Sequence, residues 1–374
     1  MSRIARAIRV VSLTTLGFRN LAPAELALSD GVTLLHGENG AGKTNLLEAL
    51  YMGLAGRSCR TRNDRETIAF GESLSRAEVV VEASGERREF LCAVDREDGR
   101  RHLVNGSPAP NAATLRPSLA VFMPDRLALV KGPPAARRSH LDGFVAALRP
   151  ARAEARRRYA RALGQRNALI ARIRSGAARD DSLDAWDTEL AEAGTELMKT
   201  RSDAVATLAP LFESTAGELG LSESEIRYAP RSKASSAAEF REELADRRGS
   251  DVKRGFSGHG PHLDEVAITL CGRATRRYAS QGQQRTALLA LLFAERDALL
   301  EERSQPPLML LDDVTSELDP ERRELLCERL AKGGSQALVT ATESSHLPAS
   351  CERLELAVRG GAAIRGVDGA SEAA

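Results

Sequence analysis

Several residue types are scarce in this chain of 374 residues, and each scarcity excludes a class of protein. The five cysteines form no Cys-x-x-Cys pair, which argues against a zinc site or a disulfide framework and fits a reducing cytosol. Only 4% of the residues are aromatic, so a surface that stacks successive bases of a single strand is not expected. No run of about 18 apolar residues occurs, so the sequence predicts a cytoplasmic protein without a transmembrane helix.

An excess of charge of one sign is also lacking. Lys and Arg number 53 and Asp and Glu number 52, which gives a formal net charge of +1. Any nucleic-acid site must therefore be a local patch. Residues 1–11 contain arginines but too short an apolar core for a signal peptide, and we interpret the segment around Val10 as a first strand.

What the sequence does contain is a phosphate-binding loop. Residues 37–44 read GENGAGKT, the pattern G-x-x-x-x-G-K-[ST], between a predicted strand at 32–35 and a predicted helix at 45–54. Such a loop turns its backbone N–H groups toward a polyphosphate, with Lys43 on the β- and γ-phosphates and Thr44 on Mg²⁺. We therefore predict that a nucleoside triphosphate is bound by Gly37, Glu38, Asn39, Gly40, Ala41, Gly42, Lys43 and Thr44.

A P-loop needs an acidic partner, and the segment 308–313 supplies one. Its four apolar residues predict a buried strand that ends in Asp312 and Asp313. Asp312 would hold Mg²⁺ with Thr44, directly or through water. Asp313 would be the catalytic base that orients the attacking water, and Lys43 the second catalytic residue. An apolar strand followed by acids is common, so this motif alone is weakly specific.

Two further blocks make the assignment specific. Residues 316–319 read SELD after the acids, and residues 280–284 read SQGQQ before an apolar helix. In chain order these blocks resemble the signature motif, Walker B motif and D-loop of an ABC-type ATPase head. A Ser hydroxyl and a Gly N–H at a helix N-terminus form a second anion-binding surface. The resemblance implies that Ser280, Gly282 and Gln283 contact the ATP held by a second subunit, so that the chain forms a homodimer on binding ATP.

The residue composition and the predicted secondary structure change twice along the chain. The length suggests two domains. Residues 1–123 and 255–374 contain most of the strand-like segments, and residues 124–254 contain long Ala-, Arg-, Glu- and Leu-rich stretches typical of helices. We predict an α/β fold in which an ABC-type P-loop ATPase head, built from both chain ends, carries an inserted, mostly helical arm domain.

A more specific resemblance, to the RecF family of bacterial DNA-repair ATPases, covers nearly the whole chain. It rests on the segments 18–20 (FRN), 39–50 (NGAGKTNLLEAL), 56–61 (GRSCRT), 129–133 (LVKGP), 260–262 (GPH), 279–286 (ASQGQQRT) and 310–319 (LLDDVTSELD).

This resemblance implies a DNA-binding protein of DNA repair, replication-fork maintenance and SOS induction that uses ATP and Mg²⁺. It implies an ATP-gated dimer that binds gapped or junction DNA, single- and double-stranded. The implied partners are RecR- and RecO-type mediators and the RecA recombinase, whose loading it would aid, with no membrane partner. Transporter-like heads carry Glu at the position of Asp313, one methylene longer, so we expect a weak ATPase used as a dimerisation switch.

Two positions depart from the family pattern. Residues 124–127 read PDRL where the family has Pro-Glu-Asp-Leu, which leaves open the role of an acid at that junction. Leu263 stands where the family has Arg, so a DNA or nucleotide contact there would be lost or moved. No switch His follows the last catalytic strand, and we assign Thr340 a role near the γ-phosphate or the attacking water.

A local excess of positive charge lies in the predicted arm. Twelve arginines occur between positions 137 and 179, opposed there by Asp142 and Glu154, and seven acids follow at 180–196. In one interpretation, two solvated helices pair through opposite charges. In the other, the arm follows the phosphates of DNA with weak sequence preference and steep salt dependence. If the first is right, DNA should lie across the head dimer instead.

Three other classes of protein share some of these sequence features. An SMC-like structural chromosome ATPase is the main alternative, but no sustained heptads fill the chain between Thr44 and Ser280, so a long coiled coil does not fit. A transporter ATPase subunit is disfavoured by the missing switch His and by the Arg-rich insertion. A phage-defence or toxin–antitoxin ATPase with an appended nuclease is disfavoured because little chain follows the last predicted strand.

Overall fold

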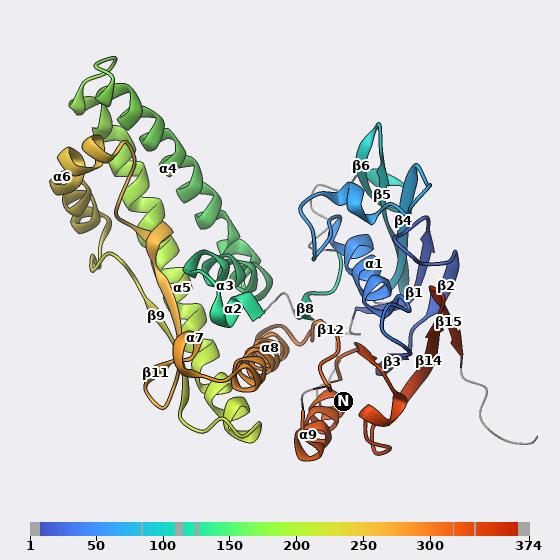
Figure 1. Cartoon of the computed structure of the whole chain (residues 1–374). Coiled ribbons are helices and arrows are strands. Elements are labelled where there is room, and N and C mark those ends of the chain that lie inside the picture. The colour runs from blue at the N-terminus through green and yellow to red at the C-terminus, as the bar shows by residue number, and fades with distance from the viewer. Residues whose placement is uncertain are drawn as a thin grey trace, which may run out of the picture. The chain divides into compact units, whose positions relative to one another are not determined.

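The computed structural model describes residues 8–83, 85–108, 115–123, 127–316, 318–332 and 334–365. The chain divides into two compact units, coloured along the chain in Figure 1. Residues 1–126 and 299–374 form one, which we call the head unit, and residues 127–298 form the other, which we call the arm unit. An α/β head with an inserted, largely helical region is confirmed.

The head unit contains two six-stranded sheets. The first is antiparallel, in the order β2 (Ala24–Ala27), β1 (Arg9–Leu16), β4 (Leu74–Ala83), β5 (Glu86–Asp95), β6 (Gly99–Val104) and β7 (Ser107–Pro108). The second has the order β15 (Ala362–Arg365), β14 (Arg353–Arg359), β3 (Val32–His36), β13 (Ala337–Ala341), β12 (Leu308–Leu311) and β8 (Leu119–Phe122). Its strands are parallel except β15, and β12 and β13 are buried along their whole lengths, as in parallel sheets covered on both faces.

Helix α1 (Lys43–Ala55) joins the two sheets through one apolar core. Its Leu47 and Leu50 belong to the same buried cluster as Phe90 of the antiparallel sheet and Leu338 of the parallel one. Packing against β4 is close, because a Cβ on Gly53 would lie 2.6 Å from a methyl of Val79. Among the described residues of this unit, the other helical elements are η1 (Asp64–Thr67), α9 (Pro320–Lys332) and η7 (Ser344–His346). The P-loop is thus anchored to both sheets.

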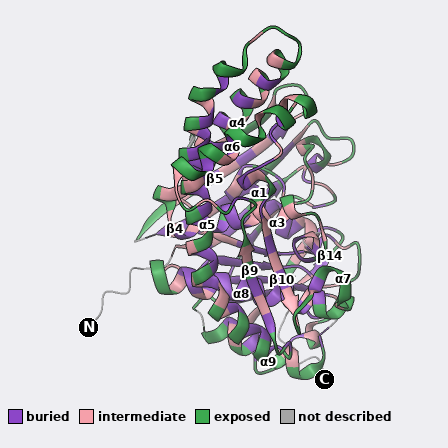
Figure 2. Ribbon diagram, turned by 90° about the vertical axis from the view of Figure 1, so that its left-hand side faces the viewer, coloured by how far each residue is buried: buried purple, intermediate pink, exposed green. Residues whose placement is uncertain are grey.

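The arm unit is built on long helices. Figure 1 shows α4 and α5 running side by side, and the outward faces of α4 and α6 are exposed in Figure 2. The helical elements are α2 (Ala128–Lys131), α3 (Pro134–Leu148), η4 (Pro150–Arg152), α4 (Ala153–Arg174), η5 (Asp180–Leu183), α5 (Asp184–Glu218), α6 (Ala237–Arg254), η6 (Pro261–Leu263), α7 (Thr275–Tyr278) and α8 (Gln281–Arg303), whose last turn passes into the head unit. An antiparallel sheet has the order β11 (Arg273–Ala274), β10 (Glu265–Leu270) and β9 (Ser224–Ala229). Among the described residues, no helix is both long and apolar enough to cross a membrane.

The second boundary of the insertion differs from the predicted one. The sequence placed it at residue 255, whereas the compact arm unit extends to Ala298. The reason is pairing across the sequence: β10 bonds to β9 from Glu265 to Leu270, and Glu295 of α8 accepts a hydrogen bond from His140 of α3 at 2.6 Å. Residues 124–126, at the first boundary, lie outside the described residues.

The Gly-Pro-His segment at 260–262 fastens three elements of the arm together. The Tyr159 hydroxyl of α4 and His262 Nδ1 are hydrogen-bonded at 2.7 Å, and His262 Nε2 lies 3.0 Å from the carbonyl of Ser257. Arg201 of α5 donates to the carbonyl of Pro261 at 2.7 Å and forms an ion pair with Asp142 of α3 at 2.8 Å. Leu263, where the resemblance leads us to expect Arg, is an exposed apolar residue that directly follows this hydrogen-bonded segment.

Candidate nucleotide and magnesium site

The P-loop occupies the turn between β3 and α1, as predicted. Gly37, Gly40 and Gly42 have φ of 152°, 81° and 110°, which glycine adopts without a steric penalty. A Cβ on Gly37 would lie 2.3 Å from the carbonyl oxygen of Val358 on β14, so the loop passes directly against that strand. This backbone gives the loop the shape that wraps an anion.

The Lys43 side chain lies over the loop itself. Its Nζ donates to the carbonyls of Gly37 at 2.6 Å and Glu38 at 2.8 Å, and the residue is 8% exposed. Burial lowers the pKa of Lys43, and the nearby carboxylates of Asp313 and Asp312 oppose that shift. The ammonium therefore faces the acidic strand end and lies within the loop that would hold phosphates.

Three strands place the acidic residues beside Thr44. In the sheet, β13 lies between β3 and β12, so residues that follow these strands meet at one edge. Thr44 Oγ1 donates to Asp312 Oδ1 at 2.9 Å, and Thr340 Oγ1 donates to the same oxygen at 2.7 Å. Burial raises the pKa of Asp312, and Asp313 adds to this, while the two threonine bonds favour the charged form. Thr340 also accepts the backbone N–H of Asp313 at 2.9 Å.

Asp313 has an uncommon backbone conformation and a buried carboxylate oxygen. Its φ is 50°, in the left-handed region, and its Oδ1 is buried without a hydrogen-bond partner among the described residues. An unmade hydrogen bond of a buried carboxylate costs free energy, so this oxygen is suited to receive a water or another polar ligand. Glu317 of the predicted D-loop lies outside the described residues.

The residues present fit Mg²⁺. The Thr44 hydroxyl and the Asp312 carboxylate are the hard oxygen ligands that this ion prefers, and they already lie 2.9 Å apart. Within the described ranges no group of three or more His, Cys, Asp or Glu residues forms a metal cage. An ion at Thr44 and Asp312 would share its remaining positions with phosphate and water, as Mg²⁺ does in P-loop proteins.

The Phe-Arg-Asn segment at 18–20 braces the P-loop, a role that the sequence motif alone did not reveal. Phe18 is fully buried in the head core. Asn20 donates to the carbonyl of Gly40 at 2.8 Å and accepts from Asn45 at 2.7 Å, so it ties the loop to the first turn of α1. Arg19 Nε binds Glu48 at 2.6 Å.

Glu48 holds the Phe-Arg-Asn segment against α1. Its side chain is fully buried on α1 and receives ion pairs from Arg19 at 2.6 Å and Arg60 at 3.1 Å, with a further bond from the Ser58 hydroxyl. Burial penalises the charged carboxylate, but the bonds from Arg19 and Ser58 outweigh it, and the pKa of Glu48 is lowered. Glu48 thus joins the N-terminal segment, the P-loop helix and the segment after that helix.

The predicted signature residues form a capping box at the start of α8. Ser280 Oγ accepts the Gln283 N–H at 3.2 Å, and Gln283 Oε1 accepts the Ser280 N–H at 2.9 Å. Ser280, Gly282 and Gln283 are exposed, and a Cβ on Gly282 would meet open space apart from Ser280 Oγ at 4.0 Å. These residues belong to the arm unit, and the P-loop, Asp312 and Asp313 belong to the head unit.

The arginines of the arm are mostly paired. Of the twelve, only the side chains of Arg161 and Arg172 make no hydrogen bond or ion pair with another described residue. The others bind as follows: Arg137 with Glu265, Arg138 with the carbonyl of Asp264, Arg149 with Thr207, Arg152 with Asp203, Arg156 with Asp142, Arg157 with Glu154, Arg158 with Glu189, Glu192 and Glu196, Arg166 with Asp187 and Asp251, Arg174 with the carbonyl of Arg254, and Arg179 with Asp181. This pattern favours helices that pair through opposite charges over an arm that follows DNA phosphates.

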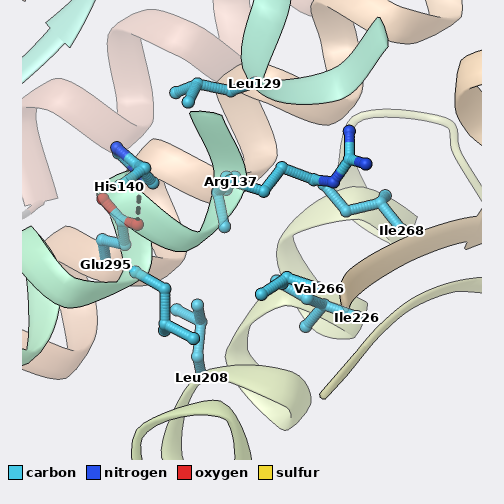
Figure 3. Close-up of a pocket in the computed structure, with 10 residues that line it drawn as sticks. Leu129, Arg137, His140, Leu208, Ile226, Val266, Ile268 and Glu295 are labelled. Atoms are coloured by element: carbon cyan, nitrogen blue, oxygen red, sulfur yellow. Dashed lines mark hydrogen bonds and ion pairs between the residues drawn. The ribbon is translucent and has the colours of Figure 1, made fainter. Parts of the chain in front are cut away.

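A cavity in the arm unit is too small for a nucleotide. It lies among α3, α8, β9 and β10, with mainly apolar side chains and the hydrogen-bonded pair His140 and Glu295 on its wall (Figure 3). Its volume of about 20 Å³ has room for roughly one water molecule. His140 is therefore a packing residue that holds α8 against α3.

The fold and the P-loop edge of the parallel sheet define an ABC-type ATPase head. The family model described as RecF/RecN/SMC N terminal domain matches residues 9–360. The DNA replication and repair protein RecF of Myxococcus xanthus is 38% identical over 371 residues, which cover 95% of this chain and 96% of that one. The chain belongs to the RecF family.

Solved structures agree with this assignment. The structure described as the recombination mediator protein RecF with ATP in the RecFOR pathway has a TM-score of 0.86 and 26% identity, and covers 98% of this chain and 100% of that one. An Smc head domain of Pyrococcus furiosus has a TM-score of 0.59 at 16% identity, covering 96% of this chain and 95% of that one, and shares the fold alone. The RecF interpretation is thereby favoured over the SMC alternative.

Glu48→Gln should destabilise the protein at neutral pH by about 3 kcal/mol, because Arg19 would lose its buried carboxylate. The folded-state pKa of Glu48 is lowered, so its stabilisation is complete above the unfolded value near 4.5 and disappears as the pH falls through the folded value. Urea unfolding from pH 7 to pH 3 should show the difference between wild type and variant shrinking below about pH 4.5. The exposed Glu97→Gln is the control, and a difference that does not change with pH contradicts this role.

Proposed function

We propose that this protein is an ATP-dependent DNA-binding protein of DNA repair, replication-fork maintenance and SOS induction. The observation that carries the proposal is the contact of Thr44 with Asp312 beside a complete P-loop, in a chain of the RecF family. The relatives are named for DNA replication and repair and for recombination mediation in the RecFOR pathway. The proposed partners are therefore gapped or junction DNA, RecR- and RecO-type mediators and the RecA recombinase.

Each residue of the candidate site has a part in ATP hydrolysis. Residues 37–44 would hold the triphosphate, with Lys43 on its β- and γ-phosphates. Thr44 and Asp312 would hold Mg²⁺, which neutralises phosphate charge when bound. Asp313 would orient the attacking water and accept its proton, and its unpartnered Oδ1 is available for that contact. Thr340 would act indirectly, because it bonds to Asp312 and to the backbone of Asp313.

The second half of the nucleotide site would come from another copy of the chain. The capping box leaves the Ser280 hydroxyl and the first turn of α8 exposed, and the helix N-terminus favours an anion. We propose that these groups contact the γ-phosphate of the partner's ATP, so that two chains enclose two nucleotides. Binding ATP would then join the heads, and hydrolysis would release them.

The rate of hydrolysis should be low. Asp313 is one methylene shorter than Glu and is fixed by the bond of its N–H to Thr340, so it holds the attacking water less closely. Steady-state turnover of the wild type with DNA should stay below about 10 s⁻¹, the median enzyme value. Asp313→Asn should lower it by roughly a further 100-fold while ATP still binds. Turnover well above that median would rule out a switch that depends on slow hydrolysis.

ATP-dependent dimerisation should require both halves of the site. In analytical ultracentrifugation with a gapped duplex, only the wild type should dimerise, and only with ATP. Lys43→Met removes the phosphate-binding ammonium, and Ser280→Arg blocks the surface offered to the partner. The matched control Ser222→Arg adds the same side chain at an exposed position of the arm unit and should behave as wild type. Equal behaviour of all four proteins would contradict the proposal.

A further inference from the structure

An open basic hollow on the head unit adjoins the nucleotide site, because Arg60 in its lining bonds to Asn45 beside Thr44. Its volume is about 450 Å³, and it is formed by the segment after α1 together with β6. Arg57, Arg60, Arg62 and Arg100 line it, and the acid among its lining residues is Asp64. Arg100 binds Asp64 at 2.6 Å, so that negative charge is already neutralised.

The four arginines divide into two kinds. Arg60 and Arg100 are held in place, because Arg60 binds Glu48 and Asn45 of α1 and Arg100 binds Asp64. Arg57 and Arg62 are exposed and make no hydrogen bond or ion pair with any other residue that the structure describes. Their ten guanidinium N–H donors are therefore available to a ligand.

A further cation, Arg116, is near enough to Arg57 for their charges to interact. Arg116 bonds to the carbonyl of Pro117 at 2.9 Å and is half-buried. Burial lowers the pKa of Arg116, Tyr51 opposes this shift, and the positive charge of Arg57 adds to it, so an anion beside Arg57 would offset that last effect.

The segment that carries these arginines has a fixed shape. Ser58 Oγ accepts the N–H groups of Arg60 at 3.0 Å and Thr61 at 3.1 Å and donates to the buried Glu48. The preceding Gly56 has φ of 70°, and a Cβ there would lie 2.5 Å from the ring of His102 on β6. The hollow is thus prepared before a ligand arrives, which reduces the entropic cost of binding.

The chemistry of the hollow matches phosphodiesters of duplex DNA. Arginine forks fit phosphate oxygens, and the one aromatic residue in the lining, Tyr51, is 8% exposed and offers no face for stacking an unpaired base. The segment follows the C-terminal end of α1 and runs back along that helix, because Arg60 bonds at 2.8 Å to Asn45 in its first turn, beside the P-loop. The paired arginines of the arm leave the head as the more suitable DNA surface.

We propose that Arg57 and Arg62 bind two backbone phosphates of duplex DNA on the head unit, with Arg60 and Arg100 as the fixed walls of the site. This inference rests on the proposed function, because it assumes that the protein binds DNA. Arg60 also contacts Asn45 and Glu48 of the P-loop helix, so DNA on this surface adjoins the segment that braces the nucleotide site.

The test is the salt dependence of duplex binding by the full chain, with ATP and Mg²⁺. For a labelled 30-base-pair duplex, Arg57→Gln/Arg62→Gln should lower the slope of log K against log salt by about two and weaken binding roughly 10- to 50-fold at 0.15 M salt. Arg57→Lys/Arg62→Lys should keep most of the slope. The matched control Arg161→Gln/Arg172→Gln removes the same charge from the arm and should bind as wild type.

ATP affinity separates the two possible sources of phosphate. It should be unchanged in Arg57→Gln/Arg62→Gln, because this variant keeps Arg60, the lining residue that bonds to Asn45 beside the P-loop. A loss of ATP affinity with unchanged DNA binding would assign the hollow to nucleotide and overturn the inference, as would an unchanged salt slope in this variant. If wild type itself fails to bind duplex with ATP, the proposed function fails as well, and that result is distinct from the other two.

Discussion

The contact between Thr44 and Asp312 depends on almost every other feature of the head. Thr44 lies in the first turn of α1 and Asp312 directly follows β12, so they meet only if β3, β13 and β12 are parallel and adjacent. Gly37 allows the loop to pass against β14, Thr340 fixes Asp312, and the Phe-Arg-Asn segment ties the loop to its helix. The candidate nucleotide site is therefore a property of the whole parallel sheet.

The arginines of the two units differ in whether they are paired with other residues. In the arm, most arginines bind to other residues of the same unit. Arg166, for example, is fully buried and pairs with Asp187 and Asp251, so it joins α4, α5 and α6. Breaking such buried pairs is costly, so they hold the unit that carries the exposed start of α8 in one shape. On the head, by contrast, Arg57 and Arg62 remain available to solvent. Near-neutral net charge thus conceals a difference in how the charges are partnered.

Much of this architecture was predictable because its signals are local. The segment at 308–311 was predicted as a strand at its observed bounds, and the P-loop lies between strand and helix as expected. What the sequence could not reveal depends on distant partners. Strand β9 lies among helices and is specified by its pairing with β10, which also moves the boundary of the insertion. The arm arginines looked like a DNA surface because their acidic partners are distributed over other helices.

The most direct test of a nucleotide site shared between two copies of the chain is ATP hydrolysis by mixed chains. Lys43→Met has an intact signature helix, and Ser280→Arg has an intact P-loop, so each should be inactive alone. Mixed in equal amounts, they should recover up to about half of wild-type turnover, because only mixed dimers form with ATP and each has one intact site of two. No recovery in mixtures that do dimerise, or full activity of Ser280→Arg alone, would contradict this account.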